Sequence, residues 1–144
     1  MRLVIIGGGN MGAAILLSLL KSESVSPEDI LLIESDGEKL QKIGDTTGCN
    51  IQTEIDETVR SYEIVLLAVK PQSATAVMEL LAQWLIPEHV VVSVMAGISL
   101  NTMRGVLGQS KLVRVMPNIP TLIGEGMSVF FASDKVGNEG REWV

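Results

Sequence analysis

The glycines near the start of the chain have the clearest chemical potential. Gly7, Gly9 and Gly12 follow the spacing G-x-G-x-x-G. In that spacing the first glycine permits a tight turn, the second lets backbone approach phosphates, and the third lets a helix pack on a strand. An anion there meets unpaired helix N–H groups and the positive end of the helix dipole. The pattern predicts a pyrophosphate site of a dinucleotide, and its residues are Gly7, Gly8, Gly9, Asn10, Met11 and Gly12.

The flanking residues support this interpretation of the glycines. Leu3–Ile6 is an apolar run typical of a strand, and Asn10–Lys21 is rich in Ala, Leu and Met, which favour a helix. Three glycines in six residues also occur in ordinary turns, so a strand-to-helix turn without a ligand is the alternative.

Length and composition narrow the class of protein. The 144 residues, 47% of them apolar, suit one domain that covers 1–144. A net charge of -6 with scattered basic residues argues against nucleic acid as a partner. Every apolar run is shorter than the roughly 18 to 20 residues that cross a bilayer, and glycines interrupt the only stretch that imitates a signal peptide. We therefore expect a cytoplasmic protein with no membrane partner.

Cysteine and histidine offer little for chemistry. Cys49 is alone, so it forms no internal disulfide and no metal-ligand pair, and we expect a small buried or loop residue. His89, the only histidine, follows Pro87 at the start of an apolar run and is predicted in a surface turn without a catalytic role. We assign no metal site and no catalytic residue, and nothing has the arrangement that a hydrolase needs.

Apolar runs alternate with helix-compatible segments along most of the chain. The predicted strands are Leu3–Ile6, Ile30–Ile33, Asn50–Thr53, Ile64–Val69, Val90–Val94 and Leu112–Met116. The predicted helices are Asn10–Lys21, Glu38–Thr46, Asp56–Ser61, Ser73–Leu85 and Ser99–Leu107. This alternation is typical of an α/β fold with a doubly wound, mostly parallel sheet of Rossmann type.

The last part of the chain breaks the pattern. Only ten residues separate Leu112–Met116 from the next strand-like run, Met127–Phe131, whereas a parallel crossover needs about a dozen or more. We therefore expect Met127–Phe131 to run antiparallel to its predecessor, followed by a final helix over Asp134–Val144.

In a doubly wound sheet the ligand lies beyond the carboxyl ends of the strands, where the strand order reverses. Besides the glycine turn, the residues predicted at those ends are Glu34, Ser35, Ala68, Val69, Lys70, Pro71, Ala96, Gly97 and Asn118.

Together these segments resemble the pyrroline-5-carboxylate reductase family, which reduces a cyclic imine to proline with NADH or NADPH, the last step of proline biosynthesis. The matching motifs are GGGNMG at 7–12, AVKP at 68–71, SVMAGI at 93–98, RVMPNIP at 114–120 and GEGM at 124–127. The resemblance covers essentially the whole chain but only the cofactor-binding half of that family's protein.

The resemblance implies roles for several residues. Gly7–Met11 would hold the pyrophosphate, Ala68–Pro71 would line the middle of the cofactor, and Ala96 would lie near the nicotinamide with Asn118 close by. It also implies a helical second domain, absent here, that completes the substrate pocket and forms the dimer. We therefore expect a homo-oligomer only with that domain, and little imine reduction by this chain alone.

Two of these side chains have an alternative interpretation. Lys70 either neutralises a cofactor phosphate or is a solvated loop charge. Its position before Pro71 predicts extended backbone. The side-chain amide of Asn118, between two prolines, forms a hydrogen bond either with the cofactor or with its own turn.

Glu34 is where the chain departs from the family, whose members commonly carry Asn-Arg or small hydroxyl residues there. An acidic residue about 20 positions after the glycines is the usual partner of the ribose 2′-hydroxyl, and a carboxylate repels a 2′-phosphate. We therefore hypothesise that the cofactor, NAD or NADP, is preferentially NAD. The alternatives are that Glu34 points to solvent and that Ser35 meets a phosphate.

Three other functions stay open at this point. The first is another dehydrogenase with a related cofactor domain, acting on a beta-hydroxyacid or linked to a deazaflavin. The second is a dinucleotide-binding module without catalysis, and the third is a purely structural α/β domain.

Overall fold

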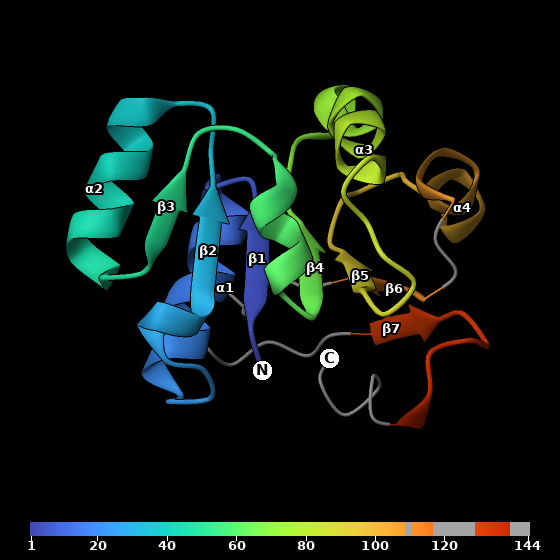
Figure 1. The fold of residues 1–144 in the computed structure, drawn as a ribbon, viewed down its shortest axis with the longest axis horizontal. Helices are drawn as coiled ribbons and strands as arrows, with labels where there is room; N and C mark the ends of the chain where they lie inside the picture. Colours follow the sequence, from blue (N-terminus) through green and yellow to red (C-terminus); the bar gives the residue numbers. More distant parts are fainter. Residues whose placement is uncertain (109–110, 117–128, 139–144) are drawn as a thin grey trace.

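The computed structural model describes residues 1–108, 111–116 and 129–138, and this part of the chain forms a single seven-stranded sheet flanked by helices (Figure 1). The strands are β1 Leu3–Ile6, β2 Ile30–Ile33, β3 Asn50–Gln52, β4 Ile64–Leu67, β5 Val90–Ser93, β6 Leu112–Met116 and β7 Val129–Ala132.

The strand order is β3-β2-β1-β4-β5-β6-β7. The pairs from β3 through β6 are all parallel, which confirms the predicted doubly wound sheet. The chain first builds the sheet outward from β1 through β2 to β3, then crosses to β4 on the other side of β1. The order therefore reverses between β1 and β4, where a doubly wound sheet binds its ligand.

The last strand confirms the prediction drawn from the short connection. β7 pairs with β6 in antiparallel orientation, with Met116 opposite Val129 and Val113 opposite Ala132. The predicted start of this strand at Met127 falls outside the described residues. The final helix does not begin at Asp134, because residues 134–136 form a turn and a bend. Of the described residues that follow, only Asn138 is helical, and 139–144 lie outside the description.

The helices are α1 Asn10–Lys21, α2 Gly37–Thr47, α3 Ala74–Ala82 and α4 Leu100–Leu107, with short 3-10 turns at η1 Pro27–Asp29, η2 Glu57–Ser61 and η3 Pro71–Ser73. Most bounds lie within two residues of the prediction. The helix predicted over Asp56–Ser61 is instead the five-residue 3-10 turn η2, and only Tyr62 and Glu63 separate it from β4. The helix predicted over Ser73–Leu85 begins with η3, where Pro71 occupies the first turn, and its α-helical part ends at Ala82.

Alternate strand residues face opposite helix layers. Val4 and Ile6 pack with Met78 of α3 and Met103 of α4. Leu3 and Ile5 belong instead to the core that includes buried residues of α1 and α2. Figure 1 shows α3 and α4 as neighbours. Both sheet faces are therefore covered, which explains why β1, β2, β4 and β5 are buried along their whole length and, apart from Ser93, apolar.

Two further expectations bear on the interior. Cys49 is buried, as expected. His89 is fully buried, so its predicted place in a surface turn is wrong: its Nδ1 accepts a hydrogen bond from the Ile86 amide at 3.1 Å, which closes the turn inward. Within the described ranges, no helix is long and apolar enough to cross a bilayer.

Candidate functional site

A cleft of about 660 Å³ opens at the carboxyl ends of β1, β2 and β4, beside the reversal of strand order. We call it the glycine cleft. Seven of the residues predicted from sequence line it: Gly7, Gly9, Glu34, Ser35, Ala68, Val69 and Lys70. The remaining wall comes from Ile6, Ile33, Asp36, Lys39, Thr53, Glu54, Ile55, Ser73, Val77 and Leu80.

The geometry of the turn requires glycine at two positions. Gly7 has a φ of +105°, and a Cβ there would lie 2.6 Å from the carbonyl oxygen of Ala68. A Cβ on Gly12 would lie 1.9 Å from the carbonyl oxygen of Gly7. Gly9 differs, because a Cβ there would meet nothing within 4 Å. The turn is therefore closely packed where α1 approaches the sheet and open at Gly9, beside the cleft.

The first turn of α1 has no side-chain cap. Its N-cap is Gly9, and no acidic residue lies in the turn. In contrast, α2 is capped by the Asp36 carboxylate, which accepts from the Lys39 amide, and α4 by the Ser99 hydroxyl, which accepts from the Thr102 amide. The helix α3 also lacks a side-chain cap, but the 3-10 turn η3 directly precedes it. The opening amides of a helix need partners and carry the positive end of its dipole. The α1 opening is thus suited to an anion, and the residues at this site fit the diphosphate of a dinucleotide.

Glu34 turns back toward the glycines instead of into solvent. Its Oε2 accepts from the Gly8 amide at 2.9 Å and from Lys39 Nζ at 3.2 Å. Its Oε1 accepts from the Asp36 amide at 3.1 Å and from Ser35 Oγ at 3.3 Å. Partial burial raises the pKa of Glu34, but the Asp36 amide, Lys39 and the Gly8 amide together bring it below the usual value. The carboxylate is therefore ionised at neutral pH and fixed at the cleft.

The other side of the cleft combines a cation with an apolar surface. Lys70 is exposed, and its backbone is extended, with φ -65° and ψ 146°, as its position before Pro71 predicts. Ile55, Val77 and the exposed Leu80 supply the apolar part. Such a mixture suits a ligand that has both charged and flat apolar groups.

Several predicted residues lie elsewhere. Gly8 is buried with its amide bonded to Glu34, and Asn10 is exposed at the start of α1. Ala96 and Gly97 are exposed after β5 and do not line the cleft. Asn118 falls outside the described residues, so its predicted contact with the cofactor stays a prediction.

Lys39 and the apolar wall were missed by the sequence reasoning. Asp36 followed three residues later by Lys39 matches the spacing of a helix N-cap, which places Lys39 in the first turn of α2 but does not predict its contact with Glu34. The apolar wall carries no comparable signal, because Ile55, Val77 and Leu80 come from two separate loop and helix segments.

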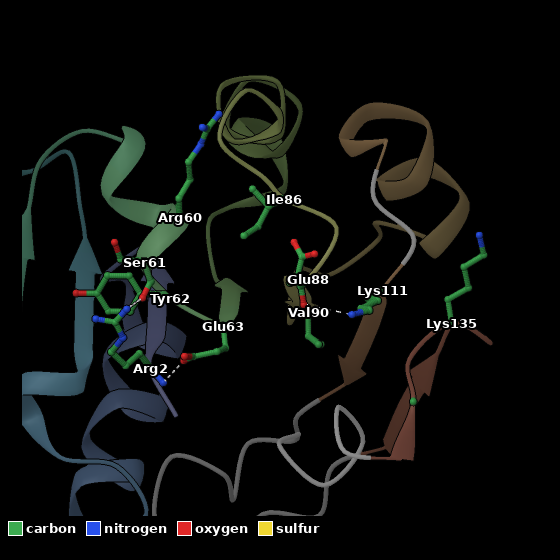
Figure 2. A pocket seen from close by; sticks show the side chains of 11 residues that line it. Arg2, Arg60, Ser61, Tyr62, Glu63, Ile86, Glu88, Val90, Lys111 and Lys135 are labelled. Carbon is green, nitrogen blue, oxygen red and sulfur yellow. Dashed lines mark hydrogen bonds between the residues drawn. The ribbon is translucent and has the colours of Figure 1, made fainter.

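A second hollow, of about 540 Å³, lies at the opposite edge of the sheet, where β1, β4, β5 and β6 begin (Figure 2). Two of its cationic side chains bind parts of the protein itself. The Arg2 guanidinium lies over the Tyr62 ring and donates to the Ser61 carbonyl, and Lys111 Nζ donates to the Glu88 carbonyl at 3.5 Å. This hollow is remote from the glycine turn, so we place the functional site at the glycine cleft.

Comparison with known proteins bears directly on this assignment. The sequence model of a family described as "NADP oxidoreductase coenzyme F420-dependent" matches residues 2–97. The pyrroline-5-carboxylate reductase of Pasteurella multocida (strain Pm70) is 36% identical over 144 residues, which cover 96% of this chain and 52% of that protein.

Solved structures agree with the sequence comparison. A pyrroline-5-carboxylate reductase from Coxiella burnetii superposes with a TM-score of 0.92 at 26% identity, covering 99% of this chain and 53% of that one. The Plasmodium falciparum pyrroline carboxylate reductase with NADP bound gives a TM-score of 0.85 at 23% identity, covering 99% and 52%, and is similar in fold. The chain thus spans about half the length of the relatives it matches.

Proposed function

The chain belongs to the family described as NADP oxidoreductase, coenzyme F420-dependent, and we propose that it is the dinucleotide-binding half of a pyrroline-5-carboxylate reductase. The uncapped opening of α1 at the carboxyl edge of the sheet carries this proposal. Similarity to the reductases from Pasteurella multocida and Coxiella burnetii supports the choice of reaction, which is the reduction of 1-pyrroline-5-carboxylate to proline.

The residues of the cleft have distinct parts in binding. The amides at the start of α1, from Asn10 and Met11, bind the pyrophosphate, and Gly9 leaves room for it to approach. Ala68 and Val69 line the middle of the cofactor, and Lys70 lies close enough to the cleft to compensate phosphate charge. The bound cofactor supplies the hydride, and this chain contributes its orientation.

The acidic end of β2 favours NADH over NADPH. Glu34 is ionised and can accept a hydrogen bond from a ribose 2′-hydroxyl. A carboxylate opposes each unit of phosphate charge at about 4 Å by about 1 kcal/mol in water and about 4 kcal/mol at an effective dielectric of 20. Glu34→Asn removes this charge and should shift the affinity ratio toward NADPH; equal affinities in the unmutated chain would contradict the preference.

Gly9→Asp tests the binding site itself. The new side chain meets open space and occupies an N-cap position that aspartate favours, so α1 should remain folded. Its carboxylate competes for the amides that bind the pyrophosphate and repels the anion. We expect NADH and NADPH to bind to the unmutated chain and to lose at least about tenfold in affinity, equivalent to about 1.4 kcal/mol, in the variant. Nicotinamide fluorescence titration measures the affinities of NADH and NADPH for the unmutated chain and for the variant.

The matched control is Asn101→Asp, which adds the same charge to the exposed first turn of α4. It should leave both affinities unchanged within about twofold, or about 0.4 kcal/mol. Unaltered binding in Gly9→Asp, or no binding of either dinucleotide to the unmutated chain, would refute the proposed function.

A further inference from the structure

Lys39 occupies an electrostatically unfavourable position. It lies in the first turn of α2, where the positive end of the helix dipole disfavours a cation. Its ion pair with Glu34 does little to offset this, because the lysine side chain is 41% exposed and exposed pairs stabilise a fold weakly. A residue that breaks a local rule without a clear structural gain marks a functional position.

The Glu34 carboxylate already has a full set of donors. A carboxylate offers about four lone-pair sites, and those of Glu34 receive the Gly8 amide, the Asp36 amide, Ser35 Oγ and Lys39 Nζ. The two amides are fixed by the backbone. Lys39, half exposed on a flexible stem, is readily displaced from Oε2. A ribose hydroxyl that donates to Glu34 can therefore take the place of the lysine ammonium.

A dinucleotide with a ribose 2′-phosphate poses the opposite problem. Such a phosphate carries about -1.5 to -2 charges at neutral pH, so Glu34 repels it. Lys39 lines the same cleft and is the cation next to Glu34. Its ammonium can leave the carboxylate and pair with the phosphate without moving the backbone.

We propose that Lys39 is a specificity-determining residue that allows this acidic site to accept NADPH as well as NADH. The inference rests on the proposed function. Lys39 neutralises Glu34 in the free protein, gives way to the ribose hydroxyls of NADH, and binds the 2′-phosphate of NADPH. Glu34 sets the preference for NADH, and Lys39 limits how far the affinity for NADH exceeds that for NADPH.

Fluorescence titration of NADH and NADPH against matched variants tests this. Lys39→Met should weaken NADPH binding at least tenfold and change NADH binding by less than threefold. Lys39→Arg keeps the charge and should restore NADPH affinity to within threefold of the unmutated chain. The control Lys42→Met removes the same charge from an exposed site on α2 outside the cleft, and should change neither affinity by more than twofold.

A double variant separates direct contact from action through Glu34. Lys39→Met should still weaken NADPH binding in the Glu34→Gln background, because the ammonium meets the phosphate itself. Loss of that effect, or equal changes for NADH and NADPH in the single variant, would overturn the inference while leaving the proposed function intact. Failure of the unmutated chain to bind either dinucleotide would overturn the proposed function, and this inference with it.

Discussion

At the scale of single residues, the site depends on one carboxylate whose surroundings are only partly readable from the sequence. The distance of Glu34 from the glycines predicts its place at the end of β2. Its bond to the Gly8 amide and its pairing with Lys39 depend on how the loop between β2 and α2 folds back. A contact between side chains five residues apart across a loop has no sequence periodicity, so the pattern could not predict it.

His89 shows the same limit for the core. A lone histidine after a proline is typical of a surface turn, but the hydrogen bond from the Ile86 amide to Nδ1 draws the ring inside. Burial lowers the pKa of His89, against partial compensation by the backbone of Tyr62 and Val59. The neutral imidazole is therefore the form that the folded chain accommodates.

His89 should make the fold less stable in mild acid. Because its folded pKa lies below the unfolded value of about 6.5, its contribution is complete above that pH and is lost as pH falls through the folded pKa. Each unit of difference between the two pKa values is worth about 1.4 kcal/mol. Urea unfolding at pH values between about 7.5 and 5 measures how steeply the free energy of unfolding falls with acid. The reference pKa of histidine in the unfolded chain is about 6.5.

His89→Asn provides the control for this pH dependence. It keeps an acceptor near Nδ1 but does not titrate. The variant is expected to be less stable overall, since it leaves a cavity. Its free energy of unfolding should nevertheless fall less steeply with acid than that of the unmutated chain. Parallel curves for the two proteins would show that His89 contributes nothing to the pH dependence.

At the scale of elements, apolar runs and helix-compatible segments predicted most strands and helices to within two residues. The runs of β1, β2 and β6 end where the prediction placed them. β4 stops at Leu67, two residues early, because Ala68 and Val69 leave the sheet to form the cleft wall. An apolar run cannot distinguish a strand from a buried turn that continues it, so this boundary required the structure.

Gly12 should be essential for the contact between α1 and β1. Ala is a better helix former than Gly by about 1 kcal/mol, yet a Cβ at Gly12 would lie 1.9 Å from the Gly7 carbonyl oxygen. We expect the strain to exceed the gain, so that Gly12→Ala lowers the free energy of unfolding by about 2 kcal/mol. Urea denaturation measures this change.

The same substitution in α4 is its control. A Cβ at Gly105 would meet nothing within 4 Å, so Gly105→Ala should stabilise the chain by about 0.5 to 1 kcal/mol. The two variants therefore differ in sign although the chemical change is identical. A stabilising Gly12→Ala would mean that α1 moves away from the turn at little cost.

At the scale of the whole molecule, the directions of the strands could be predicted from the order of the elements and the lengths of their connections. The alternation of apolar runs with helical segments predicted the parallel strands, and the ten residues counted between Met116 and Met127 predicted the antiparallel β7. The end of the chain was less predictable. The turn and bend at 134–136 follow β7, which pairs with β6, and no hydrophobic periodicity distinguishes such a turn from the start of a helix.

The arrangement also limits what this chain can do by itself. The glycine cleft lies at the carboxyl ends of β1, β2 and β4, whereas Ala96 and Gly97, predicted near the nicotinamide, are exposed after β5. Hydride transfer needs the reacting atoms held about 3 to 3.5 Å apart in a closed site. An exposed loop does not impose that geometry on a small imine. The reductases that this chain matches are about twice as long as the chain.

We therefore expect the 144-residue chain to bind reduced cofactor but to oxidise it slowly with 1-pyrroline-5-carboxylate. Loss of reduced-cofactor absorbance at saturating cofactor measures the rate, and the full-length Pasteurella multocida reductase serves as the positive control under the same conditions. A rate near that of the control, abolished by Gly9→Asp, would locate the whole substrate site within these residues. Binding without turnover is the result we expect, because orientation of the cofactor alone does not align the imine carbon.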